Sequence, residues 1–75
     1  MTATAEYLTL LGDPPAAWWA ALPERPGVEV TREAAQSAGL PCWRLTLRGE
    51  RDAVEALRND LVRRAWAQGL QLFLV

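Results

Sequence analysis

Side chains that commonly carry out chemistry are scarce and scattered in this sequence. All eight cationic residues are arginine, and the chain has no histidine. These absences exclude a histidine general base, a histidine metal ligand and a Schiff-base or phosphate-loop lysine. The nine carboxylates are spread along the chain, and helix capping or surface ion pairs account for most of them. We therefore predict no catalytic residue, no metal site and no cofactor, and expect a non-enzymatic protein.

The single cysteine, Cys42, stands at the beginning of an alternating strand pattern. No histidine is available to activate its thiol, so we interpret it as a packing residue. One cysteine also excludes an intramolecular disulfide, which fits the reducing cytoplasm. The first six residues lack the basic start and apolar run of a secretory signal, and no apolar stretch approaches the ~20 residues of a membrane helix. We expect a cytoplasmic protein without a membrane segment.

Size and composition indicate one small globular domain over residues 1–75, with residues 1–4 frayed. Hydrophobic residues make up 51% of the chain and charged residues 23%, a balance typical of folded domains. The formal net charge is −1, so nucleic acid is not expected as a partner, because phosphate binding needs clustered cations. The exclusive use of arginine is typical of a GC-rich bacterial genome.

Hydrophobic periodicity and turn residues predict six elements. The predicted strands are residues 7–11, 28–33, 42–48 and 70–75, and the predicted helices are residues 16–22 and 50–68. Asp13 is expected to cap the first helix, with Pro14 at its first position. Gly69 is expected to end the second helix, and residues 37–41 are expected to connect the two middle strands.

This order of elements predicts an α+β fold, the ferredoxin-like βαββαβ sandwich. We expect a four-stranded antiparallel sheet of order 4-1-3-2 with both helices on one face. The second helix has an apolar stripe that should meet the sheet, made of Ala53, Val54, Leu57, Leu61 and Ala65. Surface ion pairs are expected between Glu55 and Arg58, and between Asp60 and both Arg63 and Arg64.

Strand alternation assigns the sheet side chains to two faces. Those expected to point to the helices are Leu8, Leu10, Trp43, Leu45, Leu47, Leu70, Leu72 and Leu74. Those expected on the open face are Tyr7, Thr9, Leu11, Arg44, Thr46, Arg48, Gln71, Phe73 and Val75. With Tyr7, Leu11, Phe73 and Val75, the open face is more apolar than an isolated domain prefers, and the last strand is an edge without charge or proline. These features predict a homodimer through the sheet face or the edge strand. The alternative is a monomer whose open face is partly covered by the N-terminal tail.

Val62 and Trp66 lie roughly 100–140° from the centre of the apolar stripe. Trp66 either lies flat under an arginine stem or the following loop, or it contacts an unidentified partner protein. In the first helix, Leu22 lies between Trp18 and Trp19 on a helical wheel. Both indoles are then expected to seal the edges of a small core, and the alternative is that one of them is an exposed interface anchor.

Two stretches resemble small-ligand-sensing modules, the ACT domain and the related NIL domain. LTLLGDPPAAWWAAL is similar to the strand–loop–helix of the ACT domain, with Asp13 and Pro14 near its D-x-P-G turn and Pro15 in place of a glycine. GLPCWRLTLRGERDAVEALRNDL, followed by GLQLFLV, is similar to the NIL pattern of strand, glycine, helix and final strand. The resemblance implies a dimeric regulatory module that senses an amino acid near the first strand–helix loop. Its candidate ligand residues are Gly12, Asp13, Trp18 and Trp19.

The RNA-recognition motif shares this order of elements and stacks bases on aromatic side chains of its two central strands. Tyr7 is suitably placed for stacking, and Arg44 and Arg48 share its face. The third strand has nothing like the RNP1 pattern of that motif. A weak RNA-binding module is therefore one alternative and an ACT-like sensor another. The leading hypothesis is a regulatory or protein-interaction module that acts as a homodimer.

Overall fold

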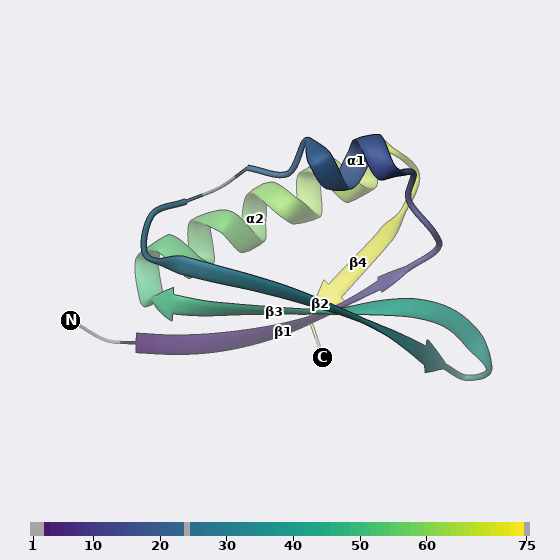
Figure 1. The fold of residues 1–75 in the computed structure, drawn as a ribbon, viewed down its shortest axis with the longest axis horizontal. Coiled ribbons are helices and arrows are strands. Elements are labelled where there is room, and N and C mark those ends of the chain that lie inside the picture. The colour runs from purple at the N-terminus through teal and green to yellow at the C-terminus, as the bar shows by residue number, and fades with distance from the viewer. Residues whose placement is uncertain (1–2, 24, 75) are drawn as a thin grey trace.

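Four antiparallel strands form one sheet, and two helices complete an α+β architecture (Figure 1). The computed structural model describes residues 3–23 and 25–74. The elements are β1 (Ala3–Leu11), α1 (Ala16–Ala20), β2 (Val28–Ser37), β3 (Leu40–Glu50), α2 (Arg51–Ala67) and β4 (Gln71–Leu74). The predicted α+β class, with four antiparallel strands and two helices, is confirmed.

β1 and β3 are the central strands, and β2 and β4 are the edges. The strand order is β2-β3-β1-β4, which is β4-β1-β3-β2 when the sheet is followed from its other edge. Both helices lie on the same side of the sheet in Figure 1, above the strands. β1 begins at Ala3, and Ala3 and Thr4 pair with Glu50 and Gly49. Of the four residues expected to fray, these two belong to the sheet, and residues 1–2 lie outside the described residues.

The core lies between the two helices and the helix side of the three strands β1, β3 and β4. Its buried members are Leu8, Leu10, Trp18, Leu45, Leu47, Val54, Leu57, Leu61, Ala65 and Leu72. The apolar stripe predicted for α2 is buried except for Ala53, which is half-buried. Trp43 and Leu70 are partly buried against this core. Leu74, which was also expected to face the helices in the core, is exposed.

Both ends of α2 are capped within one residue of the predicted limits. The Glu50 carboxylate accepts a hydrogen bond from the Ala53 amide at 3.1 Å, which satisfies a free amide of the first turn. At the other end, Gly69 has a φ of 75°. The Gly69 amide donates to the Trp66 carbonyl, and the Leu70 amide donates to the Ala65 carbonyl at 2.9 Å. This is the Schellman arrangement, and it turns the chain directly into β4.

The first helix is shorter than predicted, and Asp13 does not cap it. α1 covers Ala16–Ala20, and its N-cap is Pro15, whose ψ of 160° is extended. Pro14 precedes a proline, and that position disfavours helical geometry, so the helix begins only after Pro15. Leu22 precedes Pro23 and is excluded from the helix for the same reason. The prediction assigned both residues to the helix because it weighed each proline alone.

The hairpin of β2 and β3 is longer than predicted. Ser37 pairs with Leu40, so the turn has only two residues, Ala38 and Gly39, with φ of 52° and 81°. Two positive φ values are typical of the type I′ turn, whose twist matches that of the flanking strands. The predicted five-residue connection of residues 37–41 was therefore too long. The extra pairs carry the hairpin beyond the helices in Figure 1.

The ion pairs on α2 are partly those expected from helical spacing. Asp60 contacts Arg63 at 3.8 Å and Arg64 at 3.6 Å. The expected pair of Glu55 with Arg58 is wrong, since Glu55 contacts Arg51 at 3.5 Å. Arg58 instead contacts Glu6 of β1 at 2.6 Å. The fold thus gives Arg58 a partner from the sheet, Glu6, in place of Glu55 on its own helix.

Candidate protein-interaction surface

The two adjacent tryptophans of α1 belong to one aromatic cluster with Trp43. Trp18 is buried and contacts Trp19 edge-to-face, with ring centroids 5.1 Å apart. Trp19 contacts Trp43 at 5.3 Å. The Arg32 guanidinium lies 4.3 Å from the centroid of the Trp19 ring, a distance that allows cation–π attraction. Both indoles of α1 therefore pack within the chain. Arg32, which the sequence did not single out, covers Trp19 and also lies 5.6 Å from the centroid of the Trp43 ring.

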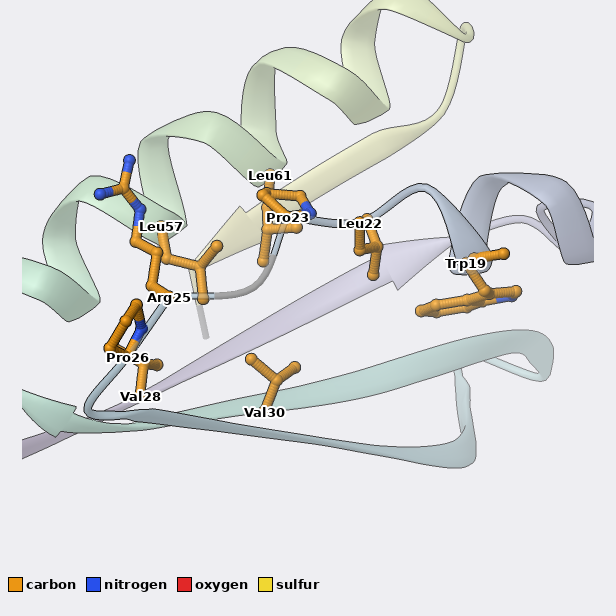
Figure 2. Close-up of a pocket in the computed structure, with 10 residues that line it drawn as sticks. Trp19, Leu22, Pro23, Arg25, Pro26, Val28, Val30, Leu57 and Leu61 are labelled. Atoms are coloured by element: carbon orange, nitrogen blue, oxygen red, sulfur yellow. The ribbon is translucent and has the colours of Figure 1, made fainter.

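Of the four candidate ligand residues, Trp19 lines a groove of about 730 Å³, and Trp18 lines a separate, smaller hollow of about 400 Å³. Gly12 and Asp13 are exposed between β1 and α1, and the Trp18 indole nitrogen points to the Arg64 carbonyl of α2, 3.5 Å away. The groove of about 730 Å³ lies instead between α2, β2 and the segment that connects α1 to β2. In Figure 2, Leu22 and Val30 point into it from opposite sides. The structure does not gather the four residues into one site.

The pair Val62 and Trp66 on α2 separates into one half-buried and one exposed side chain. Val62 is half-buried and packs against the core. Trp66, one turn later, has 67% of its surface exposed. The expected cover from an arginine stem or the following loop is therefore not the arrangement found. An exposed tryptophan keeps a large apolar area in water, and such residues are enriched among the anchors of protein interfaces.

The open face of the sheet carries two exposed aromatic side chains. Tyr7 on β1 is 49% exposed and Phe73 on β4 is 46% exposed. Phe73 pairs with Thr9, two residues from Tyr7, so the two rings are diagonal neighbours on one face. Leu11 is half-buried, so it contributes less than predicted, and Val75 lies outside the described residues.

Two small side chains on the open side of the sheet, Thr9 and Cys42, are buried. Thr9 lies between Arg44 and Phe73 on the neighbouring strands, and only 8% of it is exposed. Cys42 lies between Leu11 and Ala35 and is also buried. Its burial agrees with the interpretation of Cys42 as a packing residue.

Leu74 is an exposed apolar residue of β4 that strand alternation assigned to the covered side of the sheet. Its pairing with Leu8 places it on the helix side of the sheet, yet 56% of it is exposed. Alternation predicts the face of a side chain but not whether a helix covers that face at the end of an edge strand. The exposure of Leu74 could have been predicted from the position of the last strand at an edge of the sheet.

One edge of the molecule carries three exposed apolar side chains, Trp66, Phe73 and Leu74. We call these three residues the β4-edge patch. A hollow of about 360 Å³ joins the first two, and it is lined by Trp66, Gly69, Leu70, Gln71, Leu72 and Phe73. The patch thus includes one side chain from α2, one from the open face and one from the helix side. It is the apolar surface on which the structure unites the candidate contacts Trp66 and Phe73.

The described residues show no further grouping that assigns a chemistry. Across residues 3–23 and 25–74, no three side chains of the His, Cys, Asp or Glu type are grouped for a metal ion. Neither of the two helices described has the length and hydropathy needed to span a bilayer. Comparison of the chain with protein-family models, with curated proteins and with solved structures finds no match.

Proposed function

We propose that this chain is a non-enzymatic regulatory or protein-interaction module that acts as a homodimer. The observation that carries the proposal is the β4-edge patch, together with Tyr7 on the neighbouring strand. These four large apolar side chains are each exposed by 46% or more. Apolar surface grouped in this way is typical of interaction sites.

The fold that presents this surface is, in our proposal, ferredoxin-like. The βαββαβ order of elements, the antiparallel pairing and the position of both helices on one side of the sheet support this assignment. The same module supports interaction better than catalysis, because its buried cysteine and paired carboxylates are already engaged in packing and ion pairs. One buried cysteine also fits a cytoplasmic location.

Sedimentation velocity tests the homodimer. We expect the wild-type chain to sediment as a dimer at micromolar concentration and Phe73→Glu to sediment as a monomer, because a buried carboxylate on the apolar surface is strongly unfavourable. Gln36→Glu adds the same charge at an exposed position of β2 and should remain dimeric. Circular dichroism should show the same secondary structure in all three proteins. A wild-type chain that is monomeric throughout the micromolar range would contradict the proposal.

A second candidate function is the sensing of a small molecule such as an amino acid, as in ACT-like modules. The groove between α2 and β2 favours it, since its volume of about 730 Å³ lies in the range of ligand pockets. Trp19 and Arg25 line it together with apolar side chains. A thermal-shift screen with millimolar amino acids and nucleotides tests this function. No shift with any compound would count against it.

RNA binding receives less support than either proposal. Arg44 and Arg48 of the open face stand directly opposite Glu33 and Glu29 of β2. These carboxylates reduce the positive potential that a phosphate backbone would need. Binding that weakens with added salt and with Tyr7→Ala would restore this alternative.

A further inference from the structure

We infer that the β4 strands of two copies pair antiparallel across a two-fold axis, so that the two sheets join into one sheet of eight strands. This inference rests on the proposed homodimer and assigns its interface to the β4 edge rather than to the open face. An exposed edge strand presents a row of free amide and carbonyl groups, which is a template for another strand. The two edges of this sheet differ in whether their side chains oppose the addition of another strand.

The β2 edge carries features that oppose strand addition. Glu29 and Glu33 lie on its open-face side, opposite Arg48 and Arg44. Arg32 points to the helix side and lies over Trp19. Charged side chains on an edge strand, including inward-pointing ones, are a common means of blocking pairing between molecules. The chain therefore protects this edge.

The β4 edge has no such protection. Its described residues, Gln71–Leu74, carry no charge and no proline. Leu74 is exposed on the helix side and Phe73 on the open face, and Trp66 stands beside the strand at the end of α2. A strand added at this edge would cover apolar side chains on both faces of the sheet at once, whereas a contact through the open face alone would leave Trp66 and Leu74 in water.

A second copy of β4 fits the edge better than a charged segment does. A two-fold axis perpendicular to the sheet keeps both sets of helices on the same side, so that equivalent faces continue across the junction. Side-chain alternation then allows two central registers. Either Phe73 lies opposite the partner's Phe73, with Leu72 opposite the partner's Leu74, or Leu72 lies opposite the partner's Leu72. The first register places apolar residues together, and the second also places Gln71 opposite the partner's Phe73. Neither register brings a charge to the junction.

The size of the edge sets the expected strength of the dimer. A stable interface buries about 800 Å² on each partner, which is about one sixth of the 4976 Å² surface of this chain. The four residues of β4 provide only part of that area, and Trp66 provides a further large part because a tryptophan buries about 150–250 Å². We therefore expect a dimer of micromolar strength that depends on Trp66 as well as on β4.

A pair of matched leucine variants separates the edge from the open face. Leu74 is 56% exposed on the β4 edge, and Leu40 is 62% exposed at the hairpin turn. Leu74→Lys should weaken the dimer at least about tenfold in sedimentation equilibrium, because it places a charge on the helix side of the junction. Leu40→Lys should leave the dissociation constant unchanged. If Phe73→Glu dissociates the dimer and Leu74→Lys does not, the open face is the interface and the inference is overturned.

Cross-linking tests the strand pairing itself, in a Cys42→Ser background. Opposed residues of antiparallel strands have Cα atoms about 4.5–5.5 Å apart, which a disulfide spans. Phe73→Cys should form a disulfide dimer on mild oxidation if Phe73 faces the partner's Phe73. A mixture of Phe73→Cys and Gln71→Cys should form the mixed dimer in the other register. Thr31→Cys on β2 is the control for random collision.

The outcomes distinguish this inference from the homodimer on which it rests. Faster linking at β4 than at Thr31 supports the edge pairing. A wild-type dimer that links no faster at β4 than at Thr31 overturns the edge pairing and leaves the homodimer standing. A wild-type chain that is monomeric removes both.

Discussion

Glu6 shows how one residue of a strand becomes dependent on a distant residue of a helix. Its carboxylate contacts Arg58 at 2.6 Å, and both side chains are largely buried. Its Oε1 accepts the hydrogen bond from Arg58, while its Oε2 is buried without a hydrogen-bond partner among the described residues. Arg58 therefore neutralises a carboxylate that water reaches only in part.

We predict that Arg58→Ala lowers the free energy of unfolding by about 1–2 kcal/mol, because it leaves this carboxylate buried and uncompensated. Arg63→Ala is the matched control. The Arg63 side chain is 79% exposed and lies 3.8 Å from Asp60, so its removal should change stability by no more than about 0.5 kcal/mol. Urea unfolding measures both. In the double variant Glu6→Ala/Arg58→Ala, the loss should be smaller than the sum of the single losses, and simple additivity would contradict the coupling.

The same residues show what the sequence could and could not predict at this scale. Helical spacing identified the contacts of Asp60 with Arg63 and Arg64, since both partners lie on one element. It assigned Arg58 to Glu55, because it had no means of placing Glu6 beside α2. Likewise, the wheel put Trp18 and Trp19 around a small core, but the contacts of Trp19 with Trp43 and Arg32 depend on strand register.

At the scale of elements, Gly49 ties the beginning of β2 to the end of β3. It pairs with Val28, and its φ is 155°. A Cβ at this position would overlap the carbonyl oxygen of Gly27 and approach the Val28 Cα at 3.1 Å. Both obstacles are backbone atoms, so no side-chain rotation can relieve the overlap.

We predict that Gly49→Ala destabilises the chain by about 2–4 kcal/mol, because the two strands must separate to admit the methyl group. Gly39→Ala is the control. Gly39 also has a positive φ, 81°, but a Cβ there would meet nothing within 4 Å, so the cost should be about 1 kcal/mol from backbone strain alone. Thermal unfolding followed by circular dichroism measures both. Equal losses would show that the close approach to Gly27 has no effect.

The helices and strands were predicted well where one local rule applied and less well where two rules met. α2 begins directly after Glu50 and ends shortly before Gly69, within one residue of the predicted limits, because each terminus has a single strong signal. α1 begins at Ala16 as predicted but with Pro15 rather than Asp13 as its N-cap, and it ends at Ala20 because Leu22 precedes Pro23. The hairpin gained residues because Ala38 adopts a positive φ, which alanine rarely does and which its sequence position did not indicate.

At the scale of the whole molecule, both helices pack on one face of the sheet and leave the other face uncovered (Figure 1). The chain measures 38 × 23 × 16 Å, and its longest direction follows the β2–β3 hairpin beyond the helices in Figure 1. A 75-residue domain buries only about 60% of the surface of its unfolded chain. Alternation predicted which residues would occupy the open face. The grouping of Trp66, Phe73 and Leu74 at one edge could not be predicted in this way, because it depends on how the chain runs in space from α2 into β4.

The proposed dimer predicts that the stability of the fold depends on protein concentration. If folding is coupled to dimerisation at the β4 edge, a tenfold increase in concentration should raise the Tm of the wild-type chain by about 3–6 °C, because mass action favours the bound state. The Tm of Leu74→Lys should lie below that of the wild type at each concentration, because a dimer that is at least about tenfold weaker stabilises the fold less. Leu40→Lys should behave as the wild type does. Differential scanning calorimetry from ten to several hundred micromolar measures all three, and a wild-type Tm that is independent of concentration would show that the β4-edge patch contributes nothing to the stability of the fold.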